Sequence, residues 1–163
     1  RFNIERKFHE LSGADFNKSI SSKNIHPILS GLKWITPDFR QNPSKEISGI
    51  KYFLDLVRKE KNNKMVITNY SFVNAIIKDE LNQISRWYPV DGTGFPFEKD
   101  NDYYNIFRDF ITNRIKEKKI NTIIITSDIP ENFLGNYLNM ECLIIDRHNH
   151  FVKRYYIKKN CEL

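Results

Sequence analysis

Two apolar runs of the chain are each followed by polar side chains that could bind a ligand. Residues 65–68 (MVIT) and 122–126 (TIIIT) have the composition of buried strands. If these strands are parallel neighbours, the residues after them emerge at one carboxyl edge of a sheet, beside two helix N-termini, which suits an anion or a sugar-phosphate. The candidate ligand-binding residues at this edge are Asn69, Tyr70, Ser71 and Asp128. The competing interpretation is that Ser71 and Asp128 only cap the helices that follow.

The stretch from Ser85 to Gly94, SRWYPVDGTG, is the second candidate for a ligand site. Its arginine can pair with a phosphate or carboxylate, its rings offer stacking faces, and its glycines allow close backbone approach. The alternative is a structural loop with Trp87 in the core and Arg86 paired with a carboxylate. We predict that this loop and the first strand end close over the same edge. The candidate residues of the loop are Arg86, Trp87, Tyr88 and Asp91.

Familiar catalytic and cofactor signatures do not occur in this sequence. The glycines at 92 and 94 lack the third glycine of a dinucleotide fingerprint, and no phosphate-binding Gly-Lys-Ser loop occurs. The histidines have no carboxylate or cysteine at metal-ligand spacing. Neither a nucleophile elbow nor a zinc-protease pattern is present. We therefore expect a non-catalytic fragment with no catalytic residue, no metal and no cofactor.

The positive charge of the chain suggests a nucleic acid as a partner. The net charge is +6 and the pI is about 9.2, and fixed positive charge attracts phosphates. The lysines, however, are scattered along the chain, and the cluster at 116–119 falls at a predicted helix C-terminus, where cations are favoured by the helix dipole. Nucleic acid is therefore the weaker alternative.

Hydrophobic periodicity predicts an α/β fold. We expect strands at 31–36, 65–68 and 122–126, helices starting near 43, 72 and 102 and a short helix ending at 138, and a final strand pair at 142–146 and 151–157. The runs at 65–68 and 122–126 lack alternation, so we expect them to be parallel neighbours at the centre of a sheet. The order of elements predicts a three-layer Rossmann-like sandwich, with a mainly parallel central sheet and a C-terminal antiparallel strand pair.

The domain organisation is expected to be simple. We predict a connecting arm over residues 1–30 and a single α/β domain over 31–163. The chain begins without an initiator Met or a signal peptide, and we expect it to be part of a longer polypeptide. Cys142 and Cys161 bracket the terminal strand pair; they could form a disulfide in an oxidising compartment or remain two unrelated thiols.

Five short stretches carry a resemblance to a known class of protein. They resemble the C-terminal soluble tails of bacterial polytopic membrane proteins that look like lipid-linked-sugar glycosyltransferases of the type with many membrane spans. The likeness covers most of the chain. The stretches are ERKFHEL (5–11), GLKWITP (31–37), ITNY (67–70), SRWY (85–88) and DGT (91–93).

The resemblance implies an accessory domain outside the cytoplasmic membrane, in the periplasm, joined to a transmembrane portion of the same polypeptide. Its implied role is to bind or orient a glycan, sugar-phosphate or acceptor. In such enzymes catalysis is expected from acidic residues in loops near the membrane, which this chain does not contain, so no catalytic residue is carried over. Two alternatives remain: a nucleotide- or sugar-phosphate-binding Rossmann-like enzyme domain, and a nucleic-acid-binding module.

Overall fold

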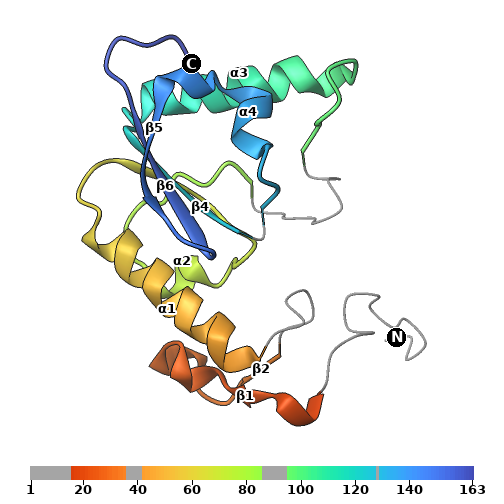
Figure 1. The fold of residues 1–163 in the computed structure, drawn as a ribbon, viewed down its shortest axis with the longest axis vertical. Coiled ribbons are helices and arrows are strands. Elements are labelled where there is room, and N and C mark those ends of the chain that lie inside the picture. The colour runs from red at the N-terminus through yellow and green to blue at the C-terminus, as the bar shows by residue number, and fades with distance from the viewer. Residues whose placement is uncertain (1–15, 36–41, 86–94, 128) are drawn as a thin grey trace. The chain divides into compact units, whose positions relative to one another are not determined.

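The computed structural model describes residues 16–35, 42–85, 95–127 and 129–163 (Figure 1). The chain divides into two compact units, residues 1–52 and residues 53–163. The domain boundary expected near residue 30 stays a prediction. Within the described ranges, every helix is too short or too polar to cross a membrane.

The first unit contains a small two-stranded sheet and the start of a long helix. Strands β1 (Ile20–Ser21) and β2 (Lys33–Trp34) pair antiparallel, so the strand expected at 31–36 is shorter than predicted and does not join the main sheet. Helix α1 runs over Pro43–Lys59, with Pro43 at its start as predicted, and crosses the boundary between the units. The Trp34 indole N–H donates a hydrogen bond to the Glu46 carboxylate over 2.9 Å. Short 3₁₀ turns occupy Phe16–Lys18, Ser22–Asn24 and Pro27–Leu29.

The second unit is built on a four-stranded mixed sheet. Its strands are β3 (Lys64–Ile67), β4 (Thr122–Thr126), β5 (Leu143–His148) and β6 (Val152–Ile157). Their order across the sheet is β3-β4-β6-β5. The β3–β4 pair is parallel, whereas β4–β6 and β5–β6 are antiparallel.

This topology corrects the predicted fold class. The sheet is mostly antiparallel and does not form a three-layer Rossmann sandwich, because the chain leaves β4 for the outer strand β5 and returns along β6 against β4. The terminal antiparallel pair is present, and β3 and β4 are parallel neighbours as expected. However, β3 lies at the edge of the sheet and not at its centre.

The edge strand β3 is buried because another part of the chain covers its free side. The Val66 N–H donates to the carbonyl oxygen of Leu81 over 2.9 Å, and the Asn82 side-chain amide donates to the carbonyl oxygen of Lys64 over 3.1 Å. Asn82 has a φ of 46°, a left-handed conformation that asparagine adopts more readily than most residues. A strand without alternation was therefore correctly predicted to be buried, although residues 81 and 82, and not a second strand, cover its free side.

Three further helices connect the strands. They are α2 (Val73–Ile76), α3 (Asp102–Glu117) and α4 (Phe133–Tyr137). The side chain of Asn101 caps α3 by accepting a hydrogen bond from the backbone N–H of Tyr103. The helix expected to start near residue 72 has four residues, because Ile77 is extended and the following residues run to the edge of β3.

One face of the sheet packs against α3 and α4 through a core rich in aromatic rings. Phe95 and Phe133 meet edge to face with ring centroids 4.8 Å apart. The Tyr137 hydroxyl donates to the carbonyl oxygen of Pro96 over 3.1 Å, and burial, with a smaller effect from Tyr104, raises the pKa of Tyr137 to about 12. The cluster joins β3, β4 and β6 to both helices: Met65, Ile67, Ile123, Ile125, Tyr155, Tyr104, Ile111, Ile115, Leu134 and Tyr137 belong to it.

Candidate functional site

The carboxyl ends of β3 and β4 lie side by side, as the sequence predicted. Ile67 is in register with Ile125 in this parallel pair. The Thr126 hydroxyl donates a hydrogen bond to the carbonyl oxygen of Ile67 over 3.4 Å, and Thr68 and Thr126 are buried. The residues after both strands therefore leave the sheet at one shared edge.

The residues after β3 form a tight, packed turn. The Tyr70 N–H donates to the Thr68 hydroxyl over 3.2 Å, and the Ser71 N–H donates to the carbonyl oxygen of Asn69 over 2.9 Å. The buried Tyr70 ring stacks on Phe151 with centroids 5.8 Å apart. Helix α2 begins at Val73 without a side-chain cap, so the capping role considered for Ser71 is wrong. Tyr70 thus contributes to packing at this edge.

A cavity of about 440 Å³ opens beside the end of β4, and we call it the carboxyl-end cavity. Its size and its mixture of apolar walls with a few polar groups are typical of small-molecule sites. Asn69, Tyr70 and Ser71 are not among the described residues that line it. The apolar lining residues are Ile125, Ile129, Pro130, Leu134 and Val152, and the others are Thr126, Ser127, Glu131, Asn149, His150, Lys153 and Tyr155.

Lys153 and Tyr155 reach this cavity because alternate residues of β6 face the same side of the sheet. Lys153 is in register with Ile125 of β4, and it forms an ion pair with Glu131. The Lys153 side chain is 24% exposed, whereas that of Glu131 is 85% exposed. Water competes strongly for so exposed a carboxylate, so the pair contributes little to stability. An anionic group of a ligand can therefore replace Glu131 at low cost.

Asn149 shapes the rim of the cavity by closing the turn between β5 and β6. Its side-chain oxygen accepts hydrogen bonds from the backbone N–H groups of Phe151 and Val152, both over 2.8 Å. Ser127 is fixed nearby, because its N–H donates to the carbonyl oxygen of Phe151 over 2.9 Å. The hydroxyl of Ser127 and the ammonium of Lys153 can both donate to a ligand. The lining thus supports noncovalent binding of hydroxyl or anionic groups.

The structure describes no potential metal site. Within the described ranges there is no group of three or more His, Cys, Asp or Glu side chains that could hold a metal ion.

Five of the eight predicted site residues lie outside the described residues. Their proposed roles therefore stay predictions. They are Arg86, Trp87, Tyr88, Asp91 and Asp128.

The sequence interpretation missed Lys153 and Tyr155 as lining residues. They alternate along the strand FVKRYYI, and this spacing places them on one face. The face becomes recognisable as part of a cavity only once β6 is known to pair with β4.

A second cavity of about 440 Å³ lies at the opposite end of the parallel pair, and we call it the amino-end cavity. Every described side chain that lines it is charged or an amide, and these charges are largely paired within the protein. The ammonium of Lys64, which is buried, lies 2.9 Å from the Asp79 carboxylate and 3.0 Å from the carbonyl oxygen of Glu60. The hydrogen bond from Lys64 and its positive charge lower the pKa of Asp79. The lining residues are Arg58, Glu60, Lys61, Asn62, Asn63, Lys64, Asp79, Glu80, Asn82 and Lys118.

The carboxylate of Glu60 extends this network to β6. It lies 3.2 Å from the Arg154 guanidinium, and both side chains are largely buried, with exposures of 4% for Glu60 and 13% for Arg154. Arg154 also pairs with Asp146 of β5. The guanidinium therefore joins the chain after α1 to the two C-terminal strands.

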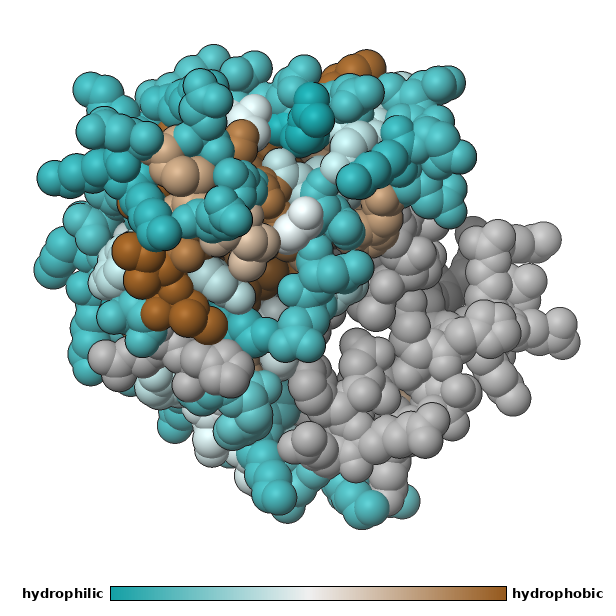
Figure 2. Space-filling model, turned by 45° about the horizontal axis from the view of Figure 1, so that its top comes forward, coloured by the Kyte–Doolittle hydropathy of each residue, from teal (hydrophilic) through white to brown (hydrophobic). Residues whose placement is uncertain are grey.

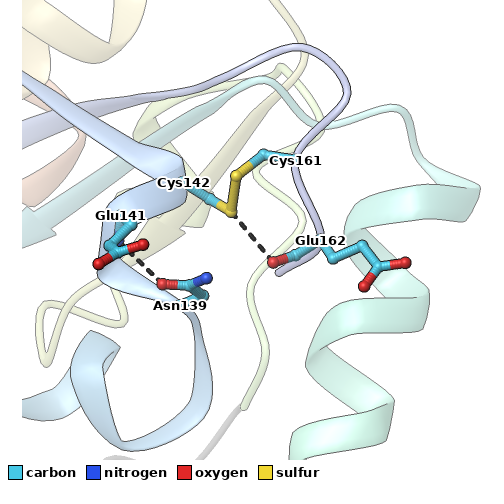
Figure 3. Close-up of a disulfide and its surroundings, with 5 residues drawn as sticks. All are labelled: Asn139, Glu141, Cys142, Cys161 and Glu162. Atoms are coloured by element: carbon cyan, nitrogen blue, oxygen red, sulfur yellow. Dashed lines mark hydrogen bonds between the residues drawn. A yellow bond between two sulfur atoms is a disulfide. The ribbon is translucent and has the colours of Figure 1, made fainter.

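A disulfide lies at the start of β5, where Cys142 is bonded to Cys161 (Figure 3). The pairing that the sequence left open is thus present. Cys142 is fully buried, and its carbonyl oxygen accepts a hydrogen bond from the Lys158 N–H over 2.8 Å. Its sulfur lies 3.0 Å from the carbonyl oxygen of Glu162, which is a close contact, since an oxidised sulfur carries no proton to donate. The antiparallel register places the disulfide toward the end of the sheet where β4 begins.

Comparison of the chain with protein-family models, curated proteins and solved structures found no match.

Proposed function

We propose that this chain is an accessory binding domain of a membrane-embedded glycosyltransferase-like protein, and that it holds a glycan or sugar-phosphate acceptor in the carboxyl-end cavity. The observation that carries the proposal is the lining of this cavity. Apolar walls formed by Ile125, Ile129 and Leu134 stand beside the polar groups of Ser127 and Lys153. Such a combination can hold a ligand that has both apolar surface and hydrogen-bonding groups.

Sugars have this dual character. The C–H face of a pyranose can pack on an aromatic ring, and Tyr155 supplies one in the cavity. Sugar hydroxyls can accept from Ser127 and donate to Glu131. A phosphate can pair with Lys153, whose present partner is a highly exposed carboxylate. Each group of a sugar-phosphate therefore has a chemically suitable counterpart.

Two further observations support the proposed location. The Cys142–Cys161 disulfide suits an oxidising compartment such as the periplasm. The five sequence stretches that resemble the tails of polytopic membrane proteins support attachment to a transmembrane portion of the same polypeptide.

The alternative of a Rossmann-like nucleotide-binding enzyme receives no support from the local geometry. It relied on two helix N-termini at the carboxyl edge of the sheet. Helices α2 and α4 have four and five residues, and such short helices have only a small dipole to offer an anion.

Isothermal titration calorimetry with a panel of neutral glycans and hexose phosphates tests the proposal. We expect a hexose phosphate to bind and Lys153→Ala to weaken its binding by about tenfold, because a charge-assisted hydrogen bond is lost. The matched control is Lys159→Ala, which removes an exposed lysine outside the cavity lining and should leave affinity unchanged.

Three results would contradict the proposal. One is equal weakening by both lysine variants, which would indicate nonspecific attraction by the net positive charge. Another is binding of single-stranded RNA or DNA in preference to every sugar. The third is ligand-induced NMR shifts that avoid Ser127, Lys153 and Tyr155.

A further inference from the structure

Helix α3 exposes a row of large apolar side chains. Tyr103, Ile106 and Phe110 are 71%, 65% and 43% exposed. Their spacing of three and four residues places them on one face of the helix. Isolated exposed apolar residues are ordinary, whereas a contiguous row marks an interaction surface. In Figure 2 most of the coloured surface is hydrophilic, and apolar residues cover the smaller part of it.

The row is held on a rigid support. Phe107 lies between the row and the core, with its ring centroid 5.6 Å from that of Phe95 and 6.3 Å from that of Phe110. On another side of the helix, Ile111 and Ile115 are buried in the core. The 16-residue helix therefore cannot turn its exposed row inward without losing core contacts.

Positive charge continues the row toward the C-terminus of α3. The Arg114 guanidinium lies 5.9 Å from the centroid of the Phe110 ring. Lys118 follows one turn later and pairs with Glu80. From 102 to 119 the sequence holds five Lys or Arg residues against three Asp or Glu residues. Aromatic and aliphatic side chains followed by cations are the composition of helices that lie in the interface of an anionic membrane.

We propose that the face of α3 formed by Tyr103, Ile106, Phe110 and Arg114 docks on an anionic lipid surface. The apolar side chains enter the boundary between headgroups and acyl chains, and Arg114 approaches the lipid phosphates. The chain as a whole carries a net charge of +6, which adds long-range attraction to such a surface. This docking requires no occupant in the carboxyl-end cavity, so it can be tested separately from ligand binding.

Co-sedimentation with lipid vesicles tests the docking. We expect the 163-residue chain to bind vesicles of phosphatidylcholine mixed with phosphatidylglycerol and to bind pure phosphatidylcholine vesicles more weakly. Tyr103→Gln combined with Ile106→Gln should lower the partition coefficient by about tenfold, because two interfacial side chains are lost. Raising the salt concentration should weaken the remaining binding.

The matched control is Ile144→Thr combined with Ile145→Thr on β5. These isoleucines are 50% and 51% exposed, so the control removes a similar apolar area elsewhere and should leave vesicle binding unchanged. Circular dichroism is used to check that both double variants stay folded. Equal loss of binding in both variants, or binding that is insensitive to phosphatidylglycerol, would overturn the proposal. So would a concentration-dependent dimer that Tyr103→Gln with Ile106→Gln abolishes while vesicle binding is unaffected, because the face would then bind a second copy.

Discussion

The two ends of the β3–β4 pair contain cavities of equal size and opposite character. The described residues that line the amino-end cavity are all charged or amide residues, and the buried Lys64 is paired with Asp79. The carboxyl-end cavity has apolar walls, and Lys153 is held by an ion pair with an exposed carboxylate. Volume alone does not distinguish them, since both measure about 440 Å³.

The difference between the two cavities indicates at which of them a ligand can replace an internal contact of the protein. At the amino end, the salt bridge between Glu60 and Arg154 is largely buried, and the disulfide lies toward the same end of the sheet. Removing one partner of a buried ion pair leaves the other charge buried without compensation, so a change in the contacts of these groups lowers stability. At the carboxyl end the partner of Lys153 is already surrounded by water, so exchange costs little. We therefore expect variants of the amino end to affect stability and variants of the carboxyl end to affect binding.

The largest effect is expected from Glu60→Ala. This change leaves the largely buried Arg154 with only part of its charge compensated, and should lower the free energy of unfolding by about 3 kcal/mol. Urea denaturation measures it. The control Glu80→Ala removes a carboxylate from the same cavity, but Glu80 and its partner Lys118 are 63% and 44% exposed; its expected effect is below about 1 kcal/mol. Equal losses in the two variants would contradict the assignment of a structural role to Glu60.

Removal of the disulfide should have a similar effect. Replacing Cys142 and Cys161 together by alanine frees a segment with a sequence separation of 19 residues and should destabilise the protein by about 3 kcal/mol. Differential scanning calorimetry of the variant and the oxidised wild type gives the change in melting temperature. The carboxyl-end cavity should retain its ligand affinity below the new melting temperature; a parallel loss of affinity would mean that the two ends are coupled.

A small effect on stability is expected from Lys153→Ala. Because its partner Glu131 is 85% exposed, the change should alter the free energy of unfolding by no more than about 1 kcal/mol. The same variant is expected to weaken binding of a hexose phosphate. Thermal denaturation with and without ligand measures both effects. A large loss of stability without ligand would show that Lys153 has a structural role, like the charged residues of the amino-end cavity.

The smallest effect concerns the pH dependence of the amino end. Folding lowers the pKa of Asp79, so its carboxylate stabilises the folded state above the ordinary value of 3.8, and this contribution disappears as the pH falls through the lowered pKa. Asp79→Asn should therefore flatten the acid side of the stability profile. Urea denaturation at a series of pH values below neutrality measures the slope. An unchanged slope would show that Lys64 does not stabilise the ionised form.

Local elements could be predicted from the sequence, but their arrangement could not. The β-branched run 122–126 became β4, and apolar residues at helical spacing after Pro43 became α1. Ile76, Ile77 and Leu81 also have helical spacing, but the chain becomes extended at Ile77 and Leu81 binds the edge of β3 instead. Hydrophobic periodicity predicts which residues are buried, but not which parts of the chain cover them.

The candidate site shows the same limit. The sequence predicted that the two apolar strands end side by side, and β3 and β4 do so. Asn69, however, is not among the described residues that line the cavity. Lys153 joins the cavity through the antiparallel pairing of β6 with β4, a long-range contact that has no local signal. Tyr70 is buried and stacks on Phe151, a packing role that an aromatic side chain at a strand end also fits, and its ligand-binding role stays a prediction.

The hydrogen bonds that cover β3 also bear on the resistance of the protein to aggregation. An exposed strand edge offers unpaired backbone groups to another chain, and such edges nucleate intermolecular sheets. The backbone of Leu81 and the amide of Asn82 occupy this position along β3. At the other edge, β5 has a register irregularity between Ile145 and Arg147, and Asp146 lies there. Bulges and charged side chains hinder the addition of a further strand. Both edges of the main sheet thus carry protection against uncontrolled polymerisation, one by the chain's own backbone and the other by irregularity and charge.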